Sequence, residues 1–144
     1  MGIERSFYRF KQGINYIFAK YNENNNDEVK KILNDEEYEI FISMSNYDKF
    51  HSYRLYEEIS KNDLLKNKKI YKKLALLHDC GKCKMGLIKR IKKVLFKNVL
   101  DNHPLMSFEK VKNIDIELAK LCLIHHDIVD DLLMKEFQKI DDKI

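Results

Sequence analysis

The 144-residue sequence has little of several residue types that mark special classes of protein. It contains one Pro, four Gly and no Trp, which excludes collagen-like and low-complexity chains. Its three Cys are an odd number and lack the spacing of a disulfide-rich domain, so we do not expect a secreted domain held together by disulfides. No apolar run approaches the roughly 18 residues that cross a bilayer, and no signal-peptide pattern opens the chain. We therefore expect a cytoplasmic protein without membrane insertion.

The charge balance is only mildly basic. Lys and Arg total 27 against 23 acidic residues, and most of these basic residues are Lys. Surfaces that recognise nucleic-acid bases or bind phosphates through paired hydrogen bonds favour Arg instead. We therefore expect no specific nucleic-acid partner. An apolar content of 44% is sufficient at this length for one globular domain with a core.

Apolar residues recur at steps of three and four along nearly the whole chain, which is the period of amphipathic helices. This period predicts helices at residues 3–21, 27–33, 35–44, 46–59, 70–77, 87–100, 114–124 and 132–140. Pro104 fits the first turn of a further short helix. Because no alternating strand pattern appears, we predict an all-α fold in a single domain.

The residues that suggest chemistry are the five histidines, which are His51, His78, His103, His125 and His126. His78 is followed directly by Asp79. Imidazole and carboxylate are the usual protein ligands of Zn, Mn and Fe, and several must converge to hold an ion. Side chains from facing helices of a bundle can supply such a set.

The order of these residues resembles the HD superfamily of metal-dependent phosphohydrolases. The matching residues are His51, the pair His78–Asp79 with Gly81 and Lys82 behind it, and a late Asp141. The resemblance covers residues 41–144 and implies a helical bundle, the HD domain. Residues 1–40 lie outside it, and we expect them to form an N-terminal helical extension packed on the core.

The resemblance also implies roles for single residues. The four-ligand metal site corresponds to His51, His78, Asp79 and Asp141, with Asp79 able to bridge two ions. The ligands of a second metal, or of the substrate phosphate, correspond to His103, His125 and His126, as in the binuclear subgroup related to HD-GYP proteins. The catalytic residues would be Asp79, Lys82 and His126. Lys82, together with Arg54 on the same helix as His51, would hold the substrate phosphate. Asp142 is the alternative to Asp141 as the last ligand.

The chain departs from the HD-GYP pattern in three places. The Gly-Tyr-Pro segment is absent, Asp127 stands where Glu follows the His pair, and Ser107 stands where Gly is expected. Because the missing segment belongs to cyclic-di-GMP hydrolysis, that activity is not implied. The metal ligands themselves are all present.

We therefore expect a phosphohydrolase, either a phosphomonoesterase or a phosphodiesterase, that acts through metal-activated water. Its substrate would be a nucleotide or another small phosphorylated metabolite. Its cofactor would be one or two divalent ions, chosen from Fe, Mn, Zn, Ni and Co. The alternative is a non-catalytic HD module that binds metal or nucleotide for regulation.

Other motifs allow competing interpretations. Cys80 and Cys83 have the spacing of a redox pair, and with Cys122 and His125 they could instead form a structural zinc site. The basic face of residues 87–100 could meet an anionic membrane or a phosphate backbone, although a solvated Lys face is the simpler interpretation. The aromatic residues of segment 3–21 would belong to the core or to a homodimer contact.

Overall fold

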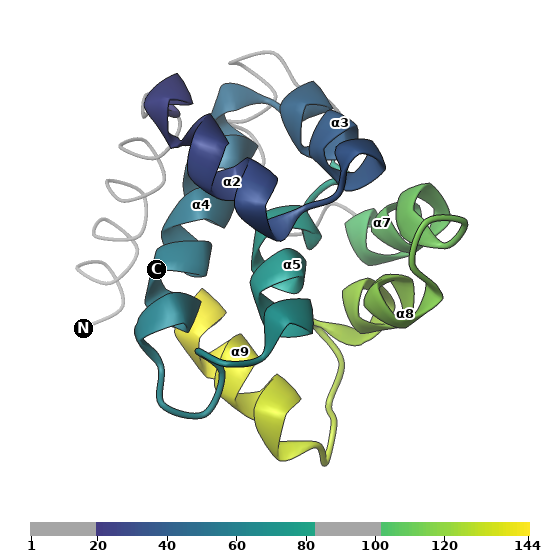
Figure 1. Cartoon of the computed structure of the whole chain (residues 1–144). Helices are drawn as coiled ribbons and strands as arrows, with labels where there is room; N and C mark the ends of the chain where they lie inside the picture. The colour runs from purple at the N-terminus through teal and green to yellow at the C-terminus, as the bar shows by residue number, and fades with distance from the viewer. Residues whose placement is uncertain (1–19, 83–101) are drawn as a thin grey trace, which may run out of the picture.

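The structure, a computed structural model, describes residues 20–82 and 102–144. In these ranges it is helical and contains no strand, which confirms the all-α prediction (Figure 1). The short 3-10 helix η1 (Glu23–Asn25) is followed by α2 (Asn26–Ile32), α3 (Asp35–Ser43), α4 (Asn46–Lys61), α5 (Lys69–Leu77), α7 (His103–Val111), α8 (Ile116–Ile124) and α9 (Leu132–Lys143). The predicted helix at 87–100 lies outside the described residues, as does nearly all of the one at 3–21. None of the described helices is long and apolar enough to span a bilayer.

Polar side chains fix where the helices begin. The Asn34 side chain accepts a hydrogen bond from the Glu37 amide at 2.8 Å, and the Glu37 carboxylate accepts one from the Asn34 amide at 2.9 Å. This capping box satisfies two amides that the helix cannot pair internally. The cap of α4 is Ser45, whose hydroxyl accepts from the Asp48 amide at 3.2 Å.

Helix α5 is the centre of the bundle. It packs against α2, α3, α4 and α8 (Figure 1). Its last four residues, Leu74–Leu77, are all fully buried. A stretch of helix that is apolar on every side lies inside a protein rather than on its surface. The chain therefore enters the next turn, which begins with His78 and Asp79, from within the bundle.

The N-terminal part of the described chain shares this core. Val29 in α2 and Phe41 in α3 are fully buried, and the ammonium of Lys73 in α5 lies 2.9 Å from the carboxylate of Glu37. The predicted boundary between residues 40 and 41 falls inside α3.

The turn after α5 is in close contact with α7. A Cβ atom on Gly81 would collide with backbone atoms of His103, Met106 and Ser107. The Gly81 amide donates to the Ser107 hydroxyl at 2.8 Å, and this hydroxyl donates to the His78 carbonyl at 2.9 Å. Only glycine allows the two backbones to approach so closely.

We expect Gly81→Ala to lower the free energy of unfolding by about 2–3 kcal/mol, because the methyl group meets backbone that cannot rotate away. Urea denaturation measures this difference. Asn67→Ala, at an exposed position, is the control and should change stability little. An unfolding free energy for Gly81→Ala equal to that of the wild type would show that α7 does not pack on this turn.

Candidate metal centre

All seven side chains expected as metal ligands lie together where five helices meet. His51 comes from α4, His78 and Asp79 follow α5, His103 begins α7, His125 and His126 follow α8, and Asp141 lies in α9. Three overlapping groups each bring three potential ligand atoms within 4.8 Å of one another. These groups are His51–His78–Asp141, His78–Asp79–His125 and His103–His125–His126. We call the seven side chains the candidate metal centre.

The carboxylate of Asp79 lies in the middle of this centre. Its Oδ1 is 3.1 Å from His103 Nε2, and its Oδ2 is 3.3 Å from His78 Nε2. The same Oδ2 is 3.2 Å from the ammonium of Lys82. The two oxygens of one carboxylate thus face histidines of two different groups, which is the placement that a bridging ligand requires.

On one side of Asp79, the last carboxylate comes from Asp141. Its Oδ1 lies 3.2 Å from His51 Nε2 and 3.6 Å from His78 Nε2. Its neighbour Asp142 is exposed and belongs to none of the three groups. Asp141 is therefore the carboxylate that reaches the centre.

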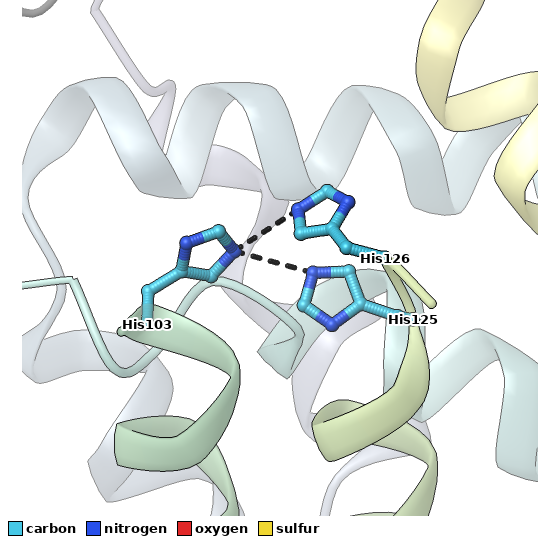
Figure 2. Close-up of side chains that lie close together, drawn as sticks. All are labelled: His103, His125 and His126. Atoms are coloured by element: carbon cyan, nitrogen blue, oxygen red, sulfur yellow. Dashed lines mark hydrogen bonds between the residues drawn. The ribbon is translucent and has the colours of Figure 1, made fainter. Parts of the chain in front are cut away.

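On the other side, three imidazoles point toward one another (Figure 2). His103 Nε2 is 3.2 Å from Nε2 of His125 and 3.2 Å from Nε2 of His126. One imidazole nitrogen carries either one hydrogen or one lone pair, so it cannot satisfy two nitrogens and the Asp79 carboxylate together. Two imidazole nitrogens bound tetrahedrally to one ion at about 2.0–2.1 Å lie about 3.3–3.4 Å apart. The donor set therefore fits a divalent cation.

Backbone carbonyls set the orientation of two of the rings. His78 donates from Nδ1 to the Ala75 carbonyl at 2.9 Å, and His125 donates from Nδ1 to the Cys122 carbonyl. Each bond leaves Nε2 facing the centre. Histidines that bind metals commonly have their second nitrogen fixed in this way.

Two supporting residues were not identified from the sequence. Gln138 in α9 donates to the carbonyls of His125 and Asp127, at 3.1 and 2.7 Å, and so fastens the turn that carries the His pair. Ser107 joins the His78 carbonyl to α7, as described above. In the sequence Ser107 stands out only as a departure from a family pattern, and no motif marks Gln138.

Burial and neighbouring charges shift the pKa values of the centre in opposite directions. Burial lowers the pKa of His78, but the carboxylates of Asp79 and Asp141 outweigh it and raise that pKa to about 9. Burial, aided by the charge of His78, lowers the pKa of His125 to about 3. Burial raises the pKa of Asp79, but His78 and Lys82 hold it well below its usual range. Without metal, the centre therefore combines a charged His78 with a neutral His125.

The two cations expected to hold phosphate lie in different places. Lys82 is largely buried and pairs with Asp79 inside the centre. Arg54 is exposed and lines a cleft of about 420 Å³ between α4 and α9, whose lining includes none of the seven ligand candidates. Lys82 thus lies within the centre, whereas Arg54 lines a different cleft.

The cysteine-based interpretations find little support. Burial raises the pKa of the Cys80 thiol to about 11, so this sulfur stays protonated at neutral pH, where redox chemistry needs a thiolate. Among the described residues, none of the groups that could hold a metal contains a cysteine. Cys83 lies outside the described residues.

Comparisons with models of known protein families, with curated proteins and with solved structures gave no match. The resemblance to the HD superfamily therefore rests on the residues of this chain and their order alone.

The His78–Asp79 pair predicts a pH dependence of stability in metal-free protein. The pKa of His78 is near 9 in the folded chain and about 6.5 in the unfolded chain. Protonated His78 therefore stabilises the fold fully below pH 6.5, and this stabilisation is lost as the pH rises to 9. We expect the wild type to lose up to about 3 kcal/mol of unfolding free energy between these pH values. Asp79→Asn should show a much flatter profile over this range.

Urea denaturation at a series of pH values, with chelator present, measures both profiles. Equal slopes for the wild type and Asp79→Asn would contradict the assigned pairing.

Proposed function

We propose that this chain is a metal-dependent phosphohydrolase that holds one or two divalent ions in the candidate metal centre. The observation that carries the proposal is the buried Asp79 carboxylate, whose two oxygens face His78 and His103 at 3.3 and 3.1 Å. Histidines and a second carboxylate from other helices surround it. Imidazole and carboxylate donors suit Fe, Mn, Zn, Ni or Co.

A divalent ion bound there would act as a Lewis acid toward a phosphoryl oxygen and would lower the pKa of a water toward about 7. The side chains fall into two sets that share Asp79. His51, His78 and Asp141 would hold one ion, and His103, His125 and His126 would hold a second. This division supports a site for two ions, as is common among enzymes that hydrolyse phosphoesters.

Lys82 and His126 have separate roles in this proposal. The Lys82 ammonium balances the charge of Asp79 and lies near enough to the ligands to meet an anionic phosphoryl group. His126 is the exposed member of the centre. Partial burial and the neighbouring His103 lower the pKa of His126, which favours its neutral form and suits a ligand or a proton acceptor better than a proton donor.

Asp141→Asn should weaken Mn²⁺ binding by at least about 100-fold. Loss of a residue that hydrogen-bonds to a metal ligand already lowers metal affinity by about 10- to 100-fold, and loss of the ligand itself should lower it at least as much. Asp142→Asn removes the same charge from the next residue and should bind Mn²⁺ like the wild type. Isothermal titration of metal-free protein measures both. If Asp142→Asn loses the metal and Asp141→Asn keeps it, the last ligand is Asp142.

Turnover tests the enzymatic part of the proposal. We expect metal-loaded protein to release phosphate from 4-nitrophenyl phosphate or to cleave bis(4-nitrophenyl) phosphate. His78→Ala and Asp79→Ala should each lower the rate by about 1,000-fold or more, because ion-dependent stabilisation of several kcal/mol is lost. Cys122→Ala, which would disrupt a structural zinc site, should keep both metal and turnover.

Hydrolysis that persists in His78→Ala and Asp79→Ala would contradict the proposal. A wild type that binds metal without hydrolysing either compound would favour the non-catalytic module.

A further inference from the structure

A cleft of about 330 Å³ opens beside the candidate metal centre, along α9 and the segment that joins it to α8. His126 and Asp141 of the centre form part of its lining. Its volume is at the lower end of the range for small-molecule sites. A phosphoester whose phosphoryl group entered the centre from this side would place the rest of the molecule in this cleft.

The charges along this cleft disfavour a second anionic group. Beyond the centre, its lining includes the carboxylates of Asp127 and Asp142 and a single ammonium, that of Lys135. All three residues are exposed, and within the described residues none of them is in an ion pair. Among these three side chains the two carboxylates outnumber the one cation, so they contribute a net charge of one negative unit to the outer cleft. Bound cations would attract the phosphoryl group to the centre, whereas these carboxylates would repel any further phosphate or carboxylate.

The same cleft offers an apolar surface. Ile128 is 104% exposed, and Val129 beside it is partly exposed; both line the cleft. Covering apolar surface with an apolar group removes it from water, which favours binding. A ligand with an uncharged, partly apolar body would gain this stabilisation, and a polyanion would not.

We infer that the cleft selects phosphoesters that have a single phosphoryl group and an uncharged, partly apolar remainder. It would discriminate against compounds with a second anionic group, such as nucleoside diphosphates and triphosphates. Asp127 and Asp142 are the residues that set this specificity. The inference rests on the proposed function for the placement of the phosphoryl group, but it concerns binding and does not require turnover.

Two non-hydrolysable probes test it. Phenylphosphonate and 4-carboxyphenylphosphonate differ by one carboxylate, and isothermal titration of Mn²⁺-loaded full-length protein gives their dissociation constants. One net negative charge about 6–8 Å from the added carboxylate of the second probe would weaken its binding through repulsion in water. We therefore expect the wild type to bind phenylphosphonate about threefold or more tightly than 4-carboxyphenylphosphonate at low salt.

In Asp127→Asn/Asp142→Asn, only the Lys135 charge remains in the outer cleft, so the preference should disappear or reverse. Glu39→Gln/Glu58→Gln removes the same charge from exposed positions that do not line this cleft and should keep the wild-type preference.

The possible results separate this inference from the proposed function. Equal affinities in the wild type, an unchanged ratio in Asp127→Asn/Asp142→Asn, or no binding of either probe would overturn the inference. Hydrolysis of phenyl phosphate is measured in parallel. Selective binding without hydrolysis would support the inference and contradict the enzymatic proposal, whereas hydrolysis without selectivity would do the opposite.

Discussion

A buried carboxylate must be paired, because removing its charge from water costs several kcal/mol. Asp79 is 3% exposed, and His78, His103 and Lys82 approach its two oxygens. These contacts join the end of α5 to the start of α7, and through His78 to Asp141 in α9. The charge that fixes these elements is also the charge that would attract a cation. Structure and proposed chemistry thus depend on the same carboxylate.

The fold places Asp79 there through the packing of α5. The apolar end of that helix is buried on every side, so the turn after it lies inside the bundle. His78 is the C-cap of α5, where a positive charge is favoured by the helix dipole. Gly81 then lets α7 approach, and the Ser107 hydroxyl links the two backbones. Helices α8 and α9 complete the centre, and Gln138 holds the connection between them.

Much of this arrangement could be predicted from the sequence, because helical periodicity and the order of histidines and aspartates are both local patterns. The choice between Asp141 and Asp142 needed the register of α9, since one residue turns a helix by about 100°. The position of Arg54 depended on how α4 meets α9, which the spacing from His51 does not reveal. The hydrogen bond between Ser107 and His78 joins residues 29 positions apart, and no pattern of residue types encodes such a pair.

The measurement that tests the account most directly is elemental analysis of tag-free wild-type protein beside Asp79→Ala, both reconstituted anaerobically. The account predicts one or two ions of Fe, Mn, Zn, Ni or Co per chain in the wild type and their loss in the variant. Two ions would assign His103, His125 and His126 to the second. A wild type that binds no metal, or a variant that keeps all of it, would contradict a metal centre built around Asp79.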